Sequence, residues 1–475
     1  MAKVVVEPRR VGGSDTIVRP RAALAPALDS AREIRALVAK LAWPSILENL
    51  LQSVFNILMI KMVAQLGPAA IAGVGASNSL NMVAMASFFA LSMGTTVLVA
   101  HATGANNPEA ASRAAKQSLI YGLILGGIIS FLGATFAPQA IAALGASPEV
   151  VAVGASYLRA FSLGGVFIVT TFIAGGVMRG SGDARTPMFV TLVSLIVSLL
   201  LAYPLIFGLW GLPELGVVGA GLATSAARGG GCIVLLTLLF RRGRGVELAG
   251  RDGWRPSLAP LRRLLDIGLP SMFESLFRAG GMLFFAAIVF RLGTTIAASQ
   301  QIVQQVVFFS MMPGFGFSMA ATTMVGQALG ADNPARAKAA SWFATRSCLV
   351  WMGTMGAVFF FGGGWIMRFF STDPEIIAQG AAALRIVALA QPGQAIGIVL
   401  AGSLRGAGDT RYPMVTTGTA MWLVRLPLAW LFGITLGFGL AGIYLGWVID
   451  SIVTASLNWL RYRTGRWQQR RVVVD

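Results

Sequence analysis

The feature that most constrains the fold of this chain is a series of apolar runs, each about 20 residues long or longer. A helix of that length crosses the hydrocarbon core of a bilayer, which is about 30 Å thick. Charged residues make up only 12% of the 475 residues, whereas a soluble domain carries about 25%. Because lipid requires every backbone polar group to be satisfied internally and the runs are long and numerous, we predict an all-α membrane protein rather than a β-barrel.

The runs predict twelve transmembrane helices. Their approximate ranges are 42–64, 71–100, 116–137, 150–178, 187–208, 216–240, 268–290, 297–326, 342–364, 376–403, 413–434 and 439–460. Lys and Arg gather in alternate connections and in both tails. Because cytoplasmic loops carry an excess of these residues, we predict a multi-pass protein of the plasma membrane, the inner membrane of a bacterium, with both termini in the cytoplasm.

The sequence also repeats itself. "GSGDARTP" at 180–187 returns as "GAGDTRYP" at 406–413, 226 residues later, and Glu48 matches Glu274 at the same offset. A duplicated unit of six helices gives two halves of the same orientation, the parallel-repeat design of many secondary transporters. We therefore predict two parallel six-helix repeats, with the substrate bound at the interface between them. The expected organisation is a basic cytoplasmic tail (1–40), an N-terminal lobe (41–240), a cytoplasmic Arg-rich linker (241–263), a C-terminal lobe (264–463) and a second cytoplasmic tail (464–475).

The repeated loops are interpreted as structural motifs that connect helices on the cytoplasmic side. Their glycines let the chain leave a helix through positive φ, the aspartate accepts backbone N–H groups, the arginine keeps the loop cytoplasmic and the proline suits the first turn of the next helix. The residues are Gly180, Gly182, Asp183, Arg185 and Pro187, and in the second copy Gly406, Gly408, Asp409, Arg411 and Pro413.

Taken together, the two halves, the repeated loops and "VGQALGADNPARA" (325–337) resemble the MATE family of multidrug and toxic compound extrusion transporters. The resemblance covers roughly residues 35–460. It implies two lobes in a V around a large cavity, and export of small amphiphilic, often cationic compounds driven by inward H⁺ or Na⁺, with no other cofactor. Many members carry an acid midway along the first helix, where this chain has Met59; acids in the seventh helix recur, and Glu274 fits that description.

Charged side chains inside the spans are expensive to insert, so each needs a partner or a function. The acids Glu48, Glu274 and Asp450 are the candidates for cation coupling. Glu274 and Arg278 lie four residues apart and hence on one helix face. They form either a structural ion pair or a switch in which protonation of Glu274 frees Arg278. Asp450 is expected to pair with Arg425, chiefly as a structural contact.

Polar and flexible side chains inside the spans are candidates for lining the substrate cavity. Gln52 and Asn56 follow Glu48 at four-residue spacing, which fits either a hydrogen-bonded network or a cation site. Glutamines of the eighth span favour a cavity, whereas Met and Phe runs also suit plain packing. The candidates are Gln52, Asn56, Met82, Gln300, Gln301, Gln304, Gln305 and Phe308.

Two further residues stand out in the spans. Pro313 and the following Gly314 are predicted to interrupt the eighth span, as a static kink or as a hinge. His101 is the only histidine and ends the second span. We interpret it as a capping or interfacial residue, with pH sensing as the alternative.

The leading hypothesis is a cation-coupled antiporter and not an enzyme, because the chain has no HExxH or GxSxG motif and no paired His/Asp set. The alternative is a flippase or exporter of anionic or lipid-linked substrates. Its motivation is the excess of in-span bases over the three acids; these bases are Lys61, Arg228, Arg278 and Arg425. A passive channel is a further alternative. The net charge of +18 is explained by the basic cytoplasmic segments of a membrane protein and not by binding to nucleic acid. The expected partners are the lipid bilayer and a small-molecule substrate, and the protein is expected to be a monomer.

Overall fold

The computed structural model describes residues 31–211, 213–241, 246, 248–250 and 253–469, and these residues are almost entirely helical, with no β-strand among them. The first half contains α1 (Ala31–Ala64), α2 (Pro68–Gly104), α3 (Pro108–Thr135), α4 (Ala137–Ala142), α5 (Pro148–Ser162), α6 (Gly165–Gly180), α7 (Arg185–Phe207) and α8 (Val217–Phe240). The second contains α9 (Leu258–Phe290), α10 (Thr294–Gly330), α11 (Pro334–Phe370), α12 (Pro374–Gly406), α13 (Arg411–Thr419), α14 (Leu426–Trp430), α15 (Gly439–Arg463) and the 3₁₀ turn Arg466–Gln469. Two π-helical segments, Ala420–Arg425 and Leu431–Thr435, flank α14.

By length and apolar composition, 11 of the described helices can cross a membrane, or 12 if the bent pair α5 and α6 counts as one. That pair is bent by 49° and corresponds to the predicted span 150–178. The segments from α13 to Thr435 together form the eleventh span. The prediction of an all-α, multi-pass membrane protein is therefore confirmed.

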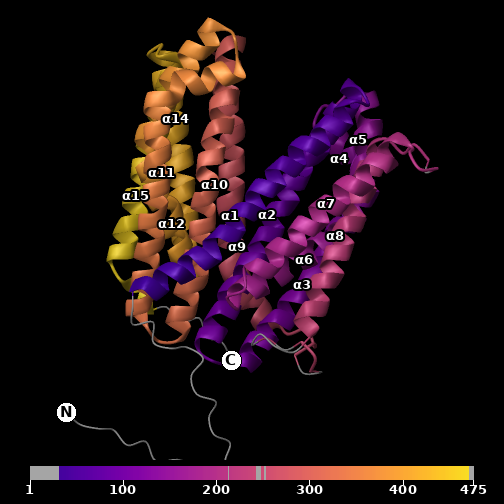
Figure 1. Cartoon of the computed structure of the whole chain (residues 1–475), viewed down its shortest axis with the longest axis vertical. Coiled ribbons are helices and arrows are strands. Elements are labelled where there is room, and N and C mark those ends of the chain that lie inside the picture. The colour runs from indigo at the N-terminus through magenta and orange to yellow at the C-terminus, as the bar shows by residue number, and fades with distance from the viewer. Residues whose placement is uncertain (1–30, 212, 242–245, 247, 251–252, 470–475) are drawn as a thin grey trace, which may run out of the picture.

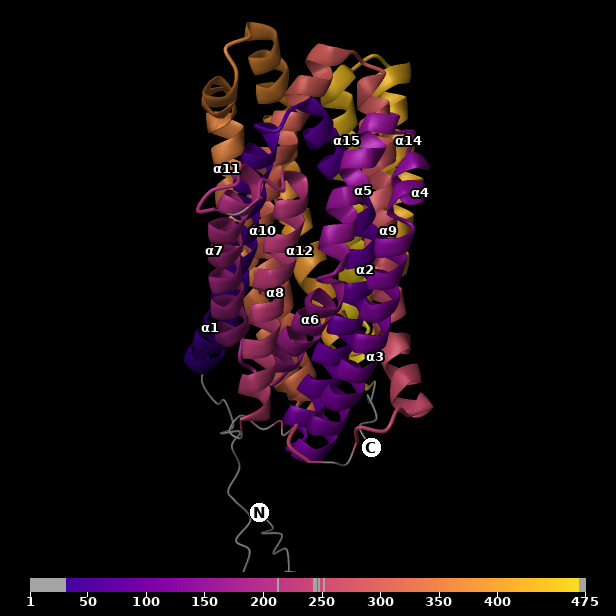
Figure 2. The same cartoon turned by 90° about the vertical axis from the view of Figure 1, so that its right-hand side faces the viewer.

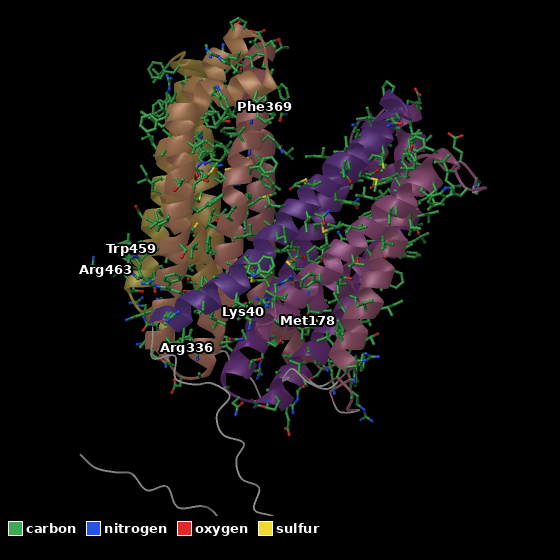
Figure 3. All side chains as sticks on the ribbon, viewed as in Figure 1. Lys40, Met178, Arg336, Phe369, Trp459 and Arg463 are labelled. Carbon is green, nitrogen blue, oxygen red and sulfur yellow. The ribbon has the colours of Figure 1, made fainter. Side chains whose placement is uncertain are left out.

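The two halves form separate bundles that meet at one end and diverge toward the other, as Figure 1 shows. We call these the joined end and the open end. In Figure 2 the N-terminal half faces the viewer, and the long helices of both halves run between the two ends. Figure 3 places Lys40, Arg336 and Arg463 toward the joined end and Phe369 toward the open end.

At the joined end, α2 of the first half packs directly on α10 of the second. A β-carbon on Gly104 would lie 2.0 Å from the carbonyl oxygen of Gln327, and one on Gly330 would lie 2.1 Å from that of His101. No side chain fits at these positions, so glycine permits the contact. The two halves are thus held in backbone contact at this end.

The first helix of each half also crosses onto the other half. Ile34, Val38 and Leu41 of α1 share an apolar cluster with Met324 of α10. Likewise Leu264 and Ile267 of α9 share a cluster with the buried side chains of α2. Residues 31–40, expected to belong to the basic tail, are therefore helical and packed; residues 1–30 lie outside the described part of the chain.

The described part of the linker packs against α3. Lys116 Nζ donates to the carbonyl oxygen of Gly250 at 2.9 Å, and Gln117 Nε2 donates to that of Gly253 at 2.6 Å. Trp254 stacks on Phe240 with the ring centroids 6.2 Å apart. The remaining linker residues (242–245, 247, 251–252) and the end of the second tail (470–475) lie outside the described residues.

The eighth span is not interrupted at Pro313. Helix α10 runs without a break from Thr294 to Gly330 with Pro313 inside it. The neighbouring Gly316 instead allows close packing, since a β-carbon there would lie 2.4 Å from Ile46 Cγ1 and 3.0 Å from the carbonyl oxygen of Ala42. The predicted interruption is therefore wrong, while the kink or hinge at Pro313 stays a prediction.

In the repeated loops, only one glycine of each pair has the predicted positive φ. Gly182 and Gly408 have φ values of 93° and 79°. Gly180 and Gly406 remain in the last turns of α6 and α12, where a β-carbon on Gly180 would lie 2.8 Å from the carbonyl oxygen of Thr96. The prediction of positive φ is wrong for these two, which are needed for close helix packing.

The aspartate of each repeated loop accepts hydrogen bonds that hold the loop in place. Asp183 Oδ1 accepts the backbone N–H groups of Arg185 and Thr186 at 3.2 Å, as predicted. Asp409 Oδ2 accepts from Arg461 Nε at 2.7 Å and ties the loop to the end of α15.

The prolines of these loops lie where the sequence predicts them. Pro187 and Pro413 occupy the first turns of α7 and α13. Arg185 lies 6.0 Å from the ring centroid of Trp43, and Arg411 lies 3.8 Å from the Asp266 carboxylate. These arginines therefore contact the first helices of the two halves, α1 and α9.

Candidate functional site

A cavity of about 360 Å³ lies between the two halves. A second cavity of about 160 Å³ extends into the C-terminal bundle. Both are lined by Glu274, Arg278, Phe315 and Arg405. The charged residues of the N-terminal half that line the first cavity are Glu48 and Arg179. The predicted cavity between the lobes is thus present in the structure.

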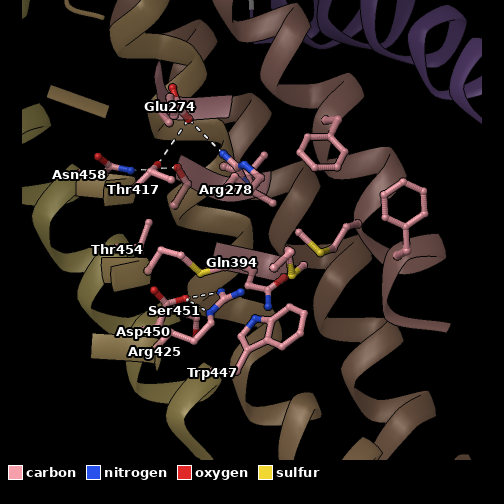
Figure 4. Close-up of a pocket in the computed structure, with 18 of the residues that line it drawn as sticks. Glu274, Arg278, Gln394, Thr417, Arg425, Trp447, Asp450, Ser451, Thr454 and Asn458 are labelled. Atoms are coloured by element: carbon pink, nitrogen blue, oxygen red, sulfur yellow. Dashed lines mark hydrogen bonds and ion pairs between the residues drawn. The ribbon is translucent and has the colours of Figure 1, made fainter. Parts of the chain in front are cut away.

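Glu274 on α9 is the most densely partnered acid of the site. Its carboxylate accepts from Arg405 Nη1 through both oxygens at 2.9 and 2.8 Å, and from Arg278 Nη2 at 3.0 Å. Thr417 Oγ1 donates to it at 3.4 Å, and Arg405 Nη2 also donates to Ser318 Oγ at 3.3 Å. Figure 4 shows Glu274 above Arg278 and Thr417. The expected pairing of Glu274 with Arg278 is confirmed.

Arg405 was not among the expected site residues. Its side chain turns from the last turn of α12 into the bundle. The signal that could have found it is the repeat: Arg179 and Arg405 are related by the same offset of 226 as Glu48 and Glu274.

The N-terminal half contains the equivalent site. Glu48 on α1 lies 3.6 Å from Arg179 Nη1 and accepts from Thr191 Oγ1 at 3.1 Å. Glu48, Arg179 and Thr191 are each 226 residues before Glu274, Arg405 and Thr417. The two sites are not equal, however, because the Glu48 side chain is 26% exposed and that of Glu274 only 4%.

Next to Glu48, the polar stripe on α1 forms a hydrogen-bonded network. Gln52 Nε2 donates to Asn56 Oδ1 at 3.2 Å, and Arg228 Nη2 on α8 donates to Gln52 Oε1 at 2.9 Å. A cation there would stand beside a guanidinium group. Of the two interpretations offered by the sequence, the contacts support the structural network.

Deeper in the C-terminal bundle, Arg425 and Asp450 form the expected ion pair. Arg425 Nε donates to Asp450 Oδ2 at 3.0 Å, and its guanidinium carbon lies 4.3 Å from the ring centroid of Trp447. Arg425 ends the π-helical segment Ala420–Arg425, and π-helical turns are frequent at functional sites. Figure 4 shows the pair beside Trp447 and below Gln394.

Only some of the predicted lining residues reach these cavities. Gln304 and Phe308 line the cavity of the C-terminal bundle. The others line neither of the two cavities, namely Gln52, Asn56, Met82, Gln300, Gln301 and Gln305. Glutamines at consecutive positions of α10 point about 100° apart, so the four are spread over about 140° of the helix surface and do not all face the cavity. Gln394, Trp447 and Asn458 line the cavity and were missed.

Met59, the position at which the resemblance implies an acid in many members, lies in an apolar cluster with Val63 and Leu195. Its side chain is buried. Met59 thus contributes to the core of the N-terminal half.

His101 lies in the contact between the two halves. Its Nε2 is 2.9 Å from the carbonyl oxygen of Gly406 at the end of α12. The mirror contact joins Gln327 Nε2 to the carbonyl oxygen of Gly180 at 2.9 Å. Each side chain caps a helix of the opposite half, so the predicted capping role is met across the joined end.

Comparison with known proteins agrees with this architecture. The MatE family profile matches residues 44–204 and 270–431, one stretch in each half. A probable multidrug resistance protein NorM of Thermotoga maritima is 32% identical over 93% of this chain and 95% of its own. The outward-facing structure of a multidrug resistance MATE family transporter matches with a TM-score of 0.85 and 24% identity over 92% of this chain and 97% of that one. A MOP superfamily transporter from Pyrococcus furiosus, described as having a binding pocket of reverse polarity, matches with a TM-score of 0.84, also at 24% identity, over 92% and 97% of the two chains.

Proposed function

Since this chain belongs to the MATE family of membrane transporters, we propose that it exports small amphiphilic molecules by alternating access, in exchange for H⁺ or Na⁺. The family places the protein among transporters rather than enzymes.

The observation that carries the proposal is the pair of acid–arginine–threonine sites on the wall of the cavity between the bundles. Glu48 and Glu274 both line that cavity, so an ion entering it reaches a carboxylate in each half. Secondary transporters with parallel repeats bind their ligands at such an interface.

Coupling at Glu274 follows from its contacts. Protonation or Na⁺ binding would neutralise the charge that holds Arg405 of α12 and Arg278 of α9. Arg405 would then lose its main partner and its position relative to α9 would change. Because charge inside a membrane must be paired, the helices of the C-terminal bundle would rearrange to a new pairing.

Orientation is assigned from the basic residues. Lys40, Arg336 and Arg463 lie toward the joined end, and the positive-inside rule assigns such residues to the cytoplasm. In this orientation the structure is open to the outside. Transport then requires the joined end to separate so that substrate enters from the cytoplasm.

The test is transport of a dye into or out of proteoliposomes under an imposed H⁺ or Na⁺ gradient. We compare wild type, Glu274→Gln and Glu48→Gln, with Glu149→Gln, an exposed acid in the first turn of α5, as the control. Glu274→Gln is expected to lower gradient-driven transport about tenfold or more, since its acid has three polar partners, while Glu48→Gln has a smaller effect. Full coupling in both variants would disprove the assigned sites.

A second candidate function concerns the charge of the substrate. The resemblance to multidrug exporters favours cationic compounds. The arginines of the cavity favour the alternative, an exporter or flippase of anionic or lipid-linked molecules.

A further inference from the structure

We infer that the cavity of the C-terminal bundle binds an anionic group of the substrate, a carboxylate, sulfonate or phosphate, with Arg278 as the principal ligand. The inference rests on the proposed transport function and specifies the substrate class of the same site.

The arginines on the cavity walls outnumber the acids by one, and the arginine without an acid of its own is Arg278. The two cavities are lined by four arginines (Arg179, Arg278, Arg405, Arg425) and three acids (Glu48, Glu274, Asp450). Each acid contacts one arginine other than Arg278, so three pairs account for three of the four arginines. Arg278 shares a carboxylate that Arg405 already holds through both oxygens.

Exposure decides which sign of charge a ligand meets. The side chains of Glu274 and Asp450 are only 4% and 6% exposed, whereas that of Arg278 is 44% exposed. The acids are thus covered by their partners, and the guanidinium of Arg278 is the accessible charge. A planar guanidinium binds carboxylate and phosphate groups through paired hydrogen bonds.

Five side chains that line the same cavity have a buried polar atom with no hydrogen-bond partner among the described residues. In Gln304 and Asn458 this atom is the side-chain carbonyl oxygen, and the donors are on Gln394, Trp447 and Arg405. Gln394 is buried, with 7% exposure, and neither atom of its amide has a hydrogen-bond partner among the described residues. The Nε1 of Trp447 likewise has none within the described part of the chain. Buried polar groups are normally hydrogen-bonded, so an acceptor group on a ligand would complete the donors of Gln394 and Trp447. Figure 4 shows Gln394 between Arg278 and Trp447.

The same cavity offers apolar contacts for the rest of the substrate. Met282, Phe308, Met311 and Phe315 line it. Methionine and phenylalanine side chains suit ligands of varied shape. The combination fits an amphiphile with one anionic group.

The N-terminal half does not duplicate this anion site. At the offset of 226, Gln52 stands in place of Arg278 and Ile168 in place of Gln394. The acid–arginine–threonine site is therefore common to both halves, whereas the surplus arginine and the free amide occur in one. We assign substrate charge recognition to the C-terminal bundle.

The experiment uses two dyes that share the xanthene ring system, anionic carboxyfluorescein and cationic rhodamine 123. Binding to the full chain in phosphatidylcholine nanodiscs is measured by fluorescence anisotropy at low and high salt. Variants are Arg278→Gln and Gln394→Leu, the second leaving every charge in place. The control is Arg291→Gln, which removes the same charge from the end of α9, where Arg291 lies 5.0 Å from the ring centroid of Trp430 and outside both cavities.

Wild type is expected to bind carboxyfluorescein at least about tenfold more tightly than rhodamine 123. Arg278→Gln should weaken carboxyfluorescein binding about 10- to 100-fold and Gln394→Leu severalfold, with Arg291→Gln unchanged. A cooperative thermal unfolding transition is the check that each variant is folded. Equal or tighter binding of rhodamine 123, no measurable binding of carboxyfluorescein, or unchanged binding in Arg278→Gln would overturn the inference.

The same dyes separate this inference from the proposed transport. If carboxyfluorescein binds through Arg278 but neither dye is moved by an H⁺ or Na⁺ gradient, the transport proposal fails and the anion site stands. If rhodamine 123 binds more tightly and is exported, the transport proposal stands and the anion site fails.

Discussion

At the scale of single residues, the arrangement of the site follows from the cost of burying charge. Glu274 is nearly inaccessible to solvent, yet it accepts hydrogen bonds from two guanidinium groups and a hydroxyl. Removing one member of a buried pair leaves an uncompensated charge, which is more costly than removing both. The pair of Glu274 and Arg405 therefore stabilises the contact between α9 and α12 only as long as both are present.

This argument predicts the effect of Arg405→Gln on stability. The substitution leaves Glu274 with Arg278 and Thr417 as partners, so we expect the free energy of unfolding to fall by up to about 3–5 kcal/mol. The double variant Glu274→Gln with Arg405→Gln should recover part of that loss. Thermal unfolding of the single and double variants in nanodiscs measures the coupling.

The equivalent substitution Arg179→Gln is the internal control for this prediction. Glu48 is more exposed and lies 3.6 Å from its arginine, and partly solvated pairs contribute less to stability. If Arg179→Gln lowered the free energy of unfolding as much as Arg405→Gln does, the assignment of the stronger ion pair to the C-terminal half would be wrong.

Sequence reasoning found two of the ion pairs of this site, Arg278 with Glu274 and Arg425 with Asp450, because charges inside the spans must be paired. Glu274 and Arg278 are one helical turn apart, so their contact follows from helix geometry. Arg405 is 131 residues from Glu274, and its distance along the chain says nothing of its position in the fold. Gln394 and Trp447 were missed for the same reason: on apolar helices the lining face is set by packing against neighbours.

At the scale of secondary structure elements, the helix pair α2 and α10 depends on two glycines. A β-carbon on Gly330 would lie 2.1 Å from the carbonyl oxygen of His101, and a backbone atom cannot move aside as a flexible side chain can. The contact between the halves at the joined end is thus built on backbone proximity.

We therefore expect Gly330→Ala to lower the unfolding free energy by about 1–3 kcal/mol, as overpacking does. The matched control is Gly353→Ala in α11, where an added β-carbon meets nothing within 4 Å. That change should stay within about 0.5 kcal/mol of wild type. Thermal unfolding measures both, and an equal effect of the two substitutions would show that the helix contact is looser than described.

At this scale the apolar runs predicted the spans, because hydropathy measures how favourably a segment is transferred into the bilayer. They did not predict the internal shape of two spans. One span bends between Ser162 and Gly165, and another contains π-helical segments on both sides of α14. Neither irregularity is visible in the mean hydropathy of the span. Such irregularities come from packing between helices, which a periodic pattern along one helix does not contain.

At the scale of the whole molecule, the repeat in the sequence becomes an approximate twofold relation between the halves. His101 and Gln327 are equivalent positions, and each bonds the repeated glycine of the opposite half. The parallel halves around a cavity could be predicted, because an even number of spans fixes their relative orientation. The crossing of α1 and α9 onto the opposite halves could not, because no local pattern encodes it.

The joined end leads to a final prediction about the transport cycle. A β-carbon on Gly326 of α10 would lie 2.9 Å from Ala100 Cβ of α2, and a disulfide needs β-carbons about 3.5–4.5 Å apart. Cysteines in the double variant Ala100→Cys with Gly326→Cys are expected to form a disulfide after a small outward shift. If transport requires the joined end to open, oxidation should abolish gradient-driven dye transport and a reductant should restore it.

The cross-link also separates a transporter from a passive channel. Single cysteine variants control for the substitutions, and Cys232 and Cys348, both buried, are replaced by alanine so that maleimide labelling counts only the introduced thiols. A channel open through the molecule would conduct dye down its gradient at the same rate in the oxidised and reduced protein. An alternating-access exporter moves dye only when the halves can part at the joined end, where α2 and α10 are in direct contact.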